Sequence, residues 1–184
     1  MTQQATPGGW LPPEQYVHTI ANATFYGCLY FTDTQGRPLG LRNAIDPNSW
    51  DWPGGNVEPR ETPWDAAVRE CAEETGIQFR GGPRLLGVTF ALPGNGWPLC
   101  HIGFVFDGGH LTGDQLNELV LDPAEHSEWR VLTMDAWRDV LTPGEYECLK
   151  AADTARRTGA ATYLHHEPEP RRRPGGTARP DPTP

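Results

Sequence analysis

The segment that decides the fold of this protein is GGNVEPRETPWDAAVRECAEETGI, residues 54–77. Thr62 is a suitable N-cap, Pro63 is a suitable first helical residue, and Asp65 lies three residues after the cap. Gly76 fits the left-handed position that ends a helix. Between these caps, side chains recur at helical spacing, namely Trp64, Val68, Cys71 and Thr75. The segment therefore predicts a helix with one buried face.

Glutamates gather on another side of the same helix. Glu70, Glu73 and Glu74 are related by i+3 and i+4 spacing, so their carboxylates project side by side. Each exposed pair of like charges costs roughly 0.2–0.5 kcal/mol, which a solvated acidic surface tolerates. A bound cation is the alternative, because it neutralises the carboxylates and removes their repulsion.

Two features favour the cation. Gly54 and Gly55 precede the helix, and glycine lets a backbone carbonyl approach a bound ion closely. Carboxylate and carbonyl oxygens suit the hard cations Mg²⁺ and Mn²⁺, whereas zinc prefers His or Cys, and Cys71 belongs to the predicted buried face. The segment thus predicts a Mg²⁺ or Mn²⁺ site of the kind that activates water for phosphate chemistry.

Residues 55–77 resemble the signature of the Nudix hydrolases, G-x5-E-x7-R-E-U-x-E-E-x-G-U, in which U is a bulky hydrophobe. The fixed positions match without a gap, and Cys71 stands where an aliphatic side chain is usual. The resemblance implies an α/β (α+β) fold, an α/β/α sandwich with a mixed sheet and one loop–helix–loop catalytic motif. It also implies Mg²⁺-dependent hydrolysis of a pyrophosphate bond in a nucleoside diphosphate linked to another moiety, by attack of water on phosphorus.

The resemblance assigns the metal ligands within this motif. Glu73 and Glu74 would bind the metal, and Glu70 would be either a further ligand or the base that activates water. The backbone carbonyl of Gly54 or Gly55 would complete the set of ligands.

Supporting roles follow from the same resemblance. Arg69 would orient the glutamates through ion pairs, with Glu73 and Glu61 as partners, and an ordinary pair on a helix surface is the alternative. A further acid from a later loop often assists in this family. The candidates for this acid are Glu118, Glu125 and Glu128, and we favour Glu125. The alternative interpretation of each one is an ordinary solvated acid.

Substrate contacts are weakly marked. Arg42 precedes the loop into the motif and is placed to contact phosphate, or else to form a surface ion pair. Trp97 lies in a loop and is placed to stack on a base. Pro93 lies sixteen residues past Ile77, as in ADP-ribose pyrophosphatases, while the compact body equally resembles enzymes that hydrolyse nucleoside triphosphates. A nucleotide or ADP-ribose sensor that binds without cleaving is the alternative function.

Outside the motif, runs of β-branched and aromatic residues predict strands. We expect one or two strands within residues 16–32, with a hairpin partner at 38–42, and further strands at 50–52, 84–92, 98–106 and 128–132. Residues 107–127 have loop-like composition. Helices are predicted at 134–141 and 143–158. Strands around one loop–helix unit, followed by helices, indicate a mixed sheet between helical layers.

Composition divides the chain into a leader at 1–13, one domain at 14–160 and a tail at 161–184. The last twenty residues, 165–184, are rich in Pro and Arg and nearly free of apolar residues, so we expect the tail to be disordered. Residues 1–164 hold 11 Lys and Arg against 21 Asp and Glu, a formal charge of −10. This charge argues against a general nucleic-acid binder. It is compatible with a small nucleotide-type substrate that binds together with a cation.

Cellular context is predicted from the cysteines and from hydropathy. The four cysteines are far apart and form no C-x-x-C pair, which is typical of a protein in a reducing compartment. The sequence has no apolar run of membrane length. We therefore expect a cytoplasmic protein without a membrane partner, and its oligomeric state, a homodimer included, is left open.

Overall fold

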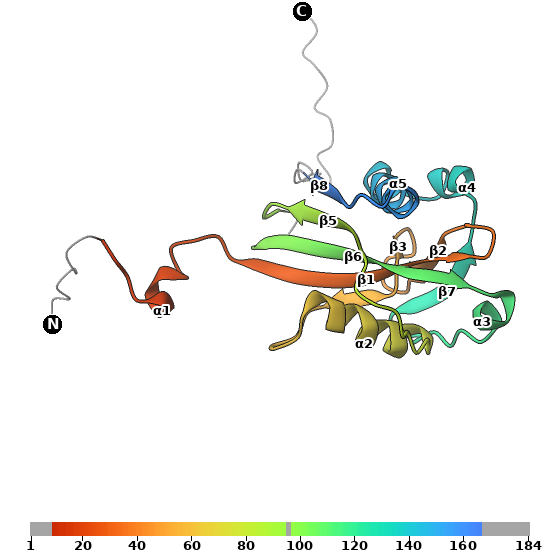
Figure 1. The fold of residues 1–184 in the computed structure, drawn as a ribbon, viewed down its shortest axis with the longest axis horizontal. Helices are drawn as coiled ribbons and strands as arrows, with labels where there is room; N and C mark the ends of the chain where they lie inside the picture. Colours follow the sequence, from red (N-terminus) through yellow and green to blue (C-terminus); the bar gives the residue numbers. More distant parts are fainter. Residues whose placement is uncertain (1–8, 95–96, 167–184) are drawn as a thin grey trace, which may run out of the picture.

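The structure is a computed structural model that describes residues 9–94 and 97–166. Within these residues the chain forms five helices and eight strands (Figure 1). The helices are α1 (Pro13–Tyr16), α2 (Pro63–Thr75), α3 (Gly113–Asn117), α4 (Met134–Arg138) and α5 (Pro143–Thr158). The strands are β1 (Ala23–Asp33), β2 (Leu39–Asn43), β3 (Trp50–Asp51), β4 (Gly54–Asn56), β5 (Leu85–Ala91), β6 (Cys100–Leu111), β7 (His126–Val131) and β8 (Thr162–His166).

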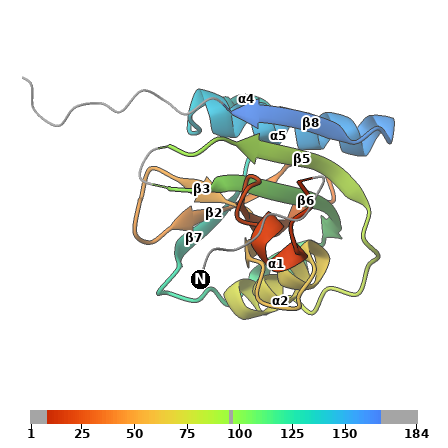
Figure 2. The same cartoon turned by 90° about the vertical axis from the view of Figure 1, so that its left-hand side faces the viewer.

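The strands of the described residues form two sheets. The larger is mixed and has the order β4-β1-β6-β5-β8, in which the pairs β1–β6 and β5–β8 are parallel. The smaller is antiparallel and has the order β3-β2-β7. Helix α2 lies on one side of the larger sheet, and α4 and α5 lie on the other (Figures 1 and 2). The predicted α/β/α sandwich with a mixed sheet is confirmed.

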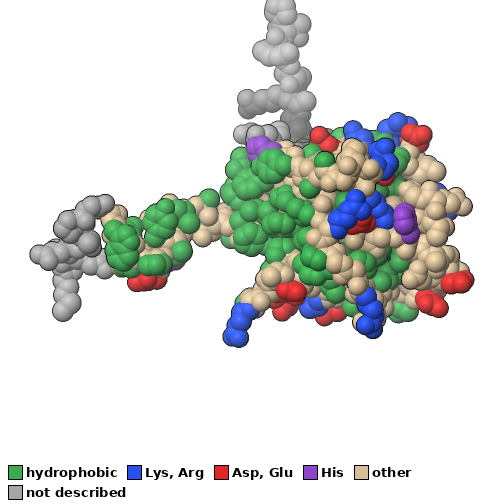
Figure 3. Space-filling view, viewed as in Figure 1, with side chains coloured by type: hydrophobic (Ala, Val, Ile, Leu, Met, Phe, Trp, Pro, Cys, Tyr) green, Lys and Arg blue, Asp and Glu red, His purple; other side chains and the backbone are tan. Residues whose placement is uncertain are grey.

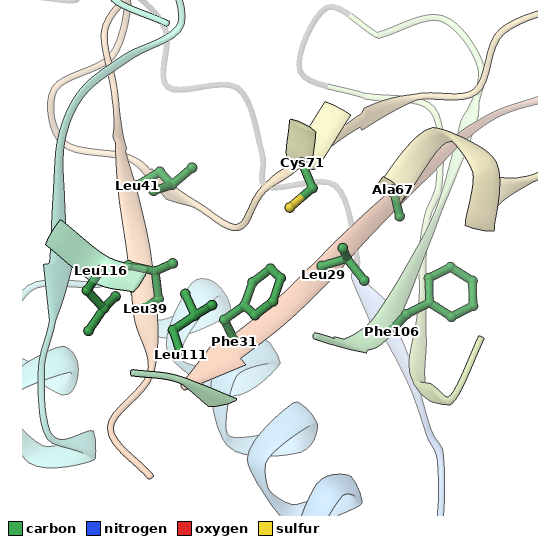
Figure 4. Packing of buried hydrophobic residues seen from close by; sticks show 9 residues of the cluster. All are labelled: Leu29, Phe31, Leu39, Leu41, Ala67, Cys71, Phe106, Leu111 and Leu116. Carbon is green, nitrogen blue, oxygen red and sulfur yellow. The ribbon is translucent and has the colours of Figure 1, made fainter. Parts of the chain in front are cut away.

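Strand β1 supplies both faces of the core, because successive side chains point to opposite faces of a strand. Leu29 and Phe31 join a cluster that includes Cys71 of α2 (Figure 4). Cys28 and Tyr30 join a second cluster under α5. Cys71 is fully buried, so it packs in place of an aliphatic residue, as a small hydrophobe does.

Helix α2 begins and ends as its sequence predicts. The Thr62 side chain accepts from the Asp65 N–H, the Asp65 carboxylate accepts from the Thr62 N–H, and Gly76 has φ 75°. Burial differs from the expectation in one respect. Glu74 is only 4% exposed, so the glutamates do not share one solvent-facing side of the helix.

Two predicted connections are wrong. The turn between Asp33 and Arg37 forms, but β1 and β2 meet only at a single bridge between Thr32 and Pro38 and then continue into different sheets. Residues 107–127 are not one loop, because β6 runs on to Leu111 and α3 follows it. The separation of β1 from β2 and the extension of β6 depend on pairing with distant strands, which composition does not report.

The ends of the domain also differ from the prediction. Strand β8 lies inside the segment that was expected to be a tail, so regular structure extends past residue 160. It pairs with β5 at the edge of the larger sheet. Helix α1 lies across the predicted boundary at residue 13. Residues 167–184, which hold most of the predicted tail, and residues 1–8 of the predicted leader lie outside the described residues. Among the helices of the described ranges, none combines the length and apolar character needed to cross a bilayer.

Candidate active site

A cavity of about 910 Å³ opens beside the second half of α2 and the end of β3. Its walls come from elements far apart in the sequence, including β1, β4, α2, β7 and α5. Six acidic residues line it: Asp51, Glu58, Glu70, Glu74, Glu125 and Glu145. Three of them are acids that the sequence analysis singled out, namely Glu70, Glu74 and Glu125. Two of these come from α2, where i+4 spacing places them on the same side of the helix.

Glu70 lies directly against the backbone of β4. A Cβ added to Gly55 would lie 2.1 Å from Glu70 Oε1, so this carboxylate needs glycine at position 55. Burial raises the pKa of Glu70, and the attraction of Arg69 only partly offsets this effect, while Glu73 and Glu125 raise it further. A carboxylate with a raised pKa and access to a cavity is suited to accept a proton.

Glu74 is held by contacts to both of its carboxylate oxygens. The Gly54 N–H donates to Oε2 at 2.8 Å, and His126 Nε2 lies 3.1 Å from Oε1. Burial raises the pKa of Glu74, and the contacts with His126 and Gly54 oppose this shift without cancelling it. Its carboxylate is therefore fixed in orientation before any ligand arrives.

His126 is the functional residue that the sequence analysis missed. It is 4% exposed, and its contact with Glu74 has the distance of an ion pair without the direction of a hydrogen bond. Neither ring nitrogen has a hydrogen-bond partner among the described residues. Burial lowers the pKa of His126, but the Glu74 carboxylate outweighs burial, so the net shift is upward. Its position next to Glu125 in the sequence was the signal that could have found it.

The structure distinguishes among the three later acids. Carboxylate oxygens of Glu74 and Glu125 and a ring nitrogen of His126 all lie within 4.8 Å of one another. Glu128 instead pairs with Arg42 and Arg130 at the surface. Glu118 is the C-cap of α3 and does not line the cavity. Of the three, Glu125 is therefore the one that the fold brings to the glutamates of α2.

Arg69 joins the glutamates of the motif through a set of short contacts. Its Nε and Nη2 donate to the two carboxylate oxygens of Glu61 at 2.8 and 3.0 Å. Its Nη1 lies 2.9 Å from Glu70 Oε1 and 3.0 Å from Glu73 Oε2. Glu73 has a side chain that is 60% exposed and does not line the cavity. The four acids of the motif thus divide into Glu70 and Glu74 at the cavity, and Glu61 and Glu73 around Arg69.

The two predicted substrate contacts lie elsewhere. Arg42 Nε donates to the Pro47 carbonyl at 2.8 Å, and its Nη1 lies 3.4 Å from Glu128 Oε2. Trp97 Nε1 donates to Thr24 Oγ1 at 2.9 Å. Neither side chain lines the cavity, so their contacts with substrate stay predictions.

Partly buried aromatic residues that pack against the core cluster under α5 also line the cavity. Trp50, Trp52 and Tyr26 all contribute to its wall. Trp50 packs against Trp137 with ring centroids 5.1 Å apart, which holds the indole in place. Tyr26 Oη donates to the Gly54 carbonyl at 2.8 Å, so this carbonyl oxygen keeps one lone pair for another partner.

The residues at the cavity fit a divalent cation. The carboxylates of Glu70, Glu74 and Glu125 supply the oxygen ligands that Mg²⁺ and Mn²⁺ prefer. His126 adds buried ring nitrogens that have no hydrogen-bond partner in the described part of the chain. Among the described residues that line the cavity there is no Lys or Arg. A cation therefore supplies positive charge that the cavity wall itself lacks.

The sequence and the fold were compared with those of known proteins. A family model described as the NUDIX domain matches residues 21–152. Diphosphoinositol polyphosphate phosphohydrolase 3-alpha from Homo sapiens is 44% identical over 62 residues, and the corresponding enzyme 2 from Mus musculus is 42% identical over 62 residues. The match to the human protein spans 33% of this chain and 37% of that protein, so it concerns a segment and not the whole of either.

Solved structures extend the likeness to most of the domain. A MutT protein from Methanosarcina mazei Go1 has a TM-score of 0.59 at 25% identity, covering 74% of this chain and 97% of that chain. An Ap4A hydrolase from C. elegans has a TM-score of 0.55 at 21% identity, covering 74% of this chain and 98% of that chain. At this level of identity the second likeness concerns the fold alone.

Proposed function

The chain belongs to the Nudix family, and from this premise we propose that it hydrolyses a pyrophosphate bond in a nucleoside diphosphate linked to another moiety. A nucleoside triphosphate and an ADP-ribose-like compound are both substrates of this kind. The observation that carries the proposal is the convergence of Glu70, Glu74 and Glu125 on one cavity. Carboxylates on a cavity wall that has no Lys or Arg among its described residues suit a divalent metal and a phosphate that bind together.

In this proposal Mg²⁺ or Mn²⁺ would be held by Glu74 and Glu125, with the carbonyl of Gly54 or Gly55 as an additional ligand, and Glu70 would be either a further ligand or the base that activates water. When bound, such an ion neutralises phosphate oxygens and lowers the pKa of a bound water. Glu73, which the resemblance also assigns to the metal, pairs with Arg69 on the outer side of α2 and is given a supporting role.

Protein groups perform the remaining steps. Where Glu70 is not itself a ligand of the ion, its carboxylate at the cavity wall is placed to take the proton from the attacking water. Arg69 positions Glu70 while it stays anchored to Glu61 by two hydrogen bonds. Glu125 is placed to assist beside Glu74, because its exposed side chain lines the cavity within 4.8 Å of the Glu74 carboxylate. His126 keeps Glu74 in one orientation.

The cavity wall also bears on the choice of substrate. Trp50, Trp52 and Tyr26 offer aromatic surface on which a base or another planar group can stack. Since the described wall has no Lys or Arg, each additional phosphate would lack a side-chain partner. We therefore favour a substrate with a nucleoside part and two or three phosphates over a heavily phosphorylated inositol.

The protein is also proposed to act in the cytoplasm. Cys28, Cys71 and Cys100 are buried free thiols, and burial raises the pKa of Cys148 to about 11, which makes its thiol unreactive near neutral pH. Free thiols persist in a reducing compartment. The partner proposed for the cavity is a small molecule, in agreement with the acidic charge of the domain.

A substrate panel tests the function. Nucleoside triphosphates, ADP-ribose, a dinucleoside polyphosphate and a diphosphoinositol polyphosphate would each be incubated with the protein and Mg²⁺, with products identified by chromatography. Turnover of a nucleotide, abolished in Glu70→Gln, is the expected result. Tight binding of a nucleotide without turnover of any compound would instead assign a sensor, and preferred turnover of the inositol compound would overturn the substrate class.

A further inference from the structure

One surface of the larger sheet is left uncovered beside α2. The start of α2 lies over Gly27, because a Cβ added there would lie 1.9 Å from the Pro63 carbonyl oxygen. Phe25 is two residues earlier on β1 and therefore points to the same face of the sheet. Phe25 lies beyond the N-terminal end of α2, and it is 43% exposed.

The pairing register extends this surface across four strands. Phe25 lies beside Ile102 of β6, and Ile102 lies beside Phe90 of β5. In the next row Val88 lies beside Tyr163 of the edge strand β8. We call this surface the apolar face and define it as Phe25, Val88, Phe90, Ile102 and Tyr163. Figure 3 shows a broad hydrophobic surface at the end of the body from which the N-terminal segment leaves.

The N-terminal segment has apolar side chains that its own chain does not cover. Helix α1 has no buried residue, and the segment stands away from the body (Figures 1 and 3). We call residues 9–22 the arm. Its large apolar side chains are exposed, with Trp10 at 63%: Trp10, Leu11, Tyr16, Val17 and Ile20. Contiguous apolar surface of this extent marks an interaction site.

We propose that the arm of one copy packs on the apolar face of a second copy, and that the exchange is reciprocal. Each chain carries one arm and one apolar face, so a two-fold pair covers both surfaces of both copies. The proposal concerns assembly and does not depend on which substrate the cavity takes.

The geometry favours a second copy over the same chain. Ala23 and Thr24 already pair in parallel with Cys100 and His101, so the direction of the chain is fixed where β1 begins. To reach its own apolar face, the arm would have to reverse immediately before Ala23. The chain does not reverse there: it turns at residues 17–19, after α1, and the arm stands away from the body of its own copy (Figure 1).

The area is sufficient for a stable dimer. An aromatic side chain has about 150–250 Å² of surface, so five large residues that are about half exposed offer on the order of 500 Å² in each arm. Two arms and the two faces that they cover then bury about 2,000 Å², which is within the range of specific, stable interfaces.

Sedimentation equilibrium of the full chain tests the proposal. We expect a dimer whose dissociation constant rises at least tenfold in an arm variant, Trp10→Ser with Ile20→Ser, and in a face variant, Tyr163→Lys. Tyr163 is 66% exposed on an edge strand, so its replacement is compatible with folding. The matched control is Val120→Ser, because Val120 is exposed but belongs to neither surface. The control should dimerise as the unaltered chain does.

A mixing experiment distinguishes exchange from other contacts. The arm variant keeps its apolar face and the face variant keeps its arm, so an equimolar mixture should contain more dimer than either variant alone. A monomeric unaltered chain overturns the proposal, as does a dimer that survives in the arm variant. A monomer whose unfolding midpoint falls on loss of the arm would show that the arm packs on its own chain, which also overturns it.

Discussion

His126 Nε2 lies 3.1 Å from Glu74 Oε1, and both side chains are almost fully buried. The pair joins α2 to the first residue of β7 across the cavity wall. The Gly54 N–H holds the other oxygen of Glu74, so the carboxylate is fixed from two sides. The orientation of a proposed metal ligand thus depends on a residue outside the sequence motif.

Replacement of His126 tests this dependence. We expect His126→Ala to weaken Mn²⁺ binding and turnover by about 10–100-fold, the usual loss when a group that orients a metal ligand is removed. His126→Gln keeps a hydrogen-bond donor near Glu74 and should retain more of both. Isothermal titration with Mn²⁺ measures the binding, and equal losses in the two variants would show that a hydrogen-bond donor at position 126 does not orient Glu74.

Glu70 and Glu73 form a matched pair of sites on one helix. Glu70 lines the cavity, whereas the Glu73 side chain is 60% exposed and pairs with Arg69. Glu70→Gln should reduce turnover by at least 10²-fold, because an amide cannot accept the proton. Glu73→Gln should reduce it by less than tenfold. The turnover rate constant of each variant provides the comparison. A larger loss in Glu73→Gln than in Glu70→Gln would indicate that Glu73 is a metal ligand.

Two glycines separate the requirements of the site from those of the fold. In Gly55→Ala the new methyl group meets the flexible end of Glu70, so activity should fall while the protein stays folded. In Gly27→Ala it meets the backbone of Pro63, which cannot yield without moving α2. We expect Gly27→Ala to lose about 3 kcal/mol of unfolding free energy, at the upper end for an overpacked site. Urea titration measures the unfolding free energy of both variants. A Gly27→Ala protein as stable as the unaltered chain would contradict the position of α2.

Metal ions should stabilise the folded state by mass action. A cation that binds the folded state alone adds about 2.7 kcal/mol at a concentration one hundred times its dissociation constant. We expect Mn²⁺ to raise the melting temperature and EDTA to remove the increase. The effect should be much smaller in Glu74→Gln, since this substitution removes a charge that the ion would bind. Calorimetry with equal melting temperatures in Mn²⁺ and EDTA would argue against a formed site.

The environment of Asp33, which lies outside the cavity, predicts how the stability of the folded state depends on pH. Burial alone raises the pKa of Asp33, but the Arg37 backbone and guanidinium and the Gln35 N–H outweigh burial and lower it below its ordinary value. The ionised carboxylate therefore stabilises the folded state above the unfolded pKa of about 3.9, and this contribution is lost as pH falls through the lower folded pKa.

The substitution Asp33→Asn measures this contribution. We expect a loss of about 1–3 kcal/mol at pH 7, which is typical of hydrogen bonds that involve a charged group. The difference between the two proteins should shrink as pH falls below about 3.9. Urea titrations at pH 7 and at pH 3 provide the comparison, and a difference that is independent of pH would contradict the assignment.

Features that depend on neighbouring residues could be predicted from the sequence. The caps of α2, its left-handed end at Gly76 and the bounds of α5 at 143–158 all agree with the structure. The expected strands at 50–52, 84–92 and 128–132 correspond to β3, β5 and β7 within a few residues. Strand β8 and the separation of β1 from β2 could not be predicted, because they depend on pairing with strands far away in the chain.

The sequence by itself determined the family motif, the helix that carries it and the grouping of acids on one short segment, because hydrogen bonds and side-chain spacing within a helix are local. Only the tertiary structure decided which acids face the cavity. It turned Glu70 and Glu74 inward and Glu73 outward, and it brought His126 to Glu74. The physical reason is that the direction of a helix face and the register of β7 are set by packing on the whole sheet, which no short segment encodes.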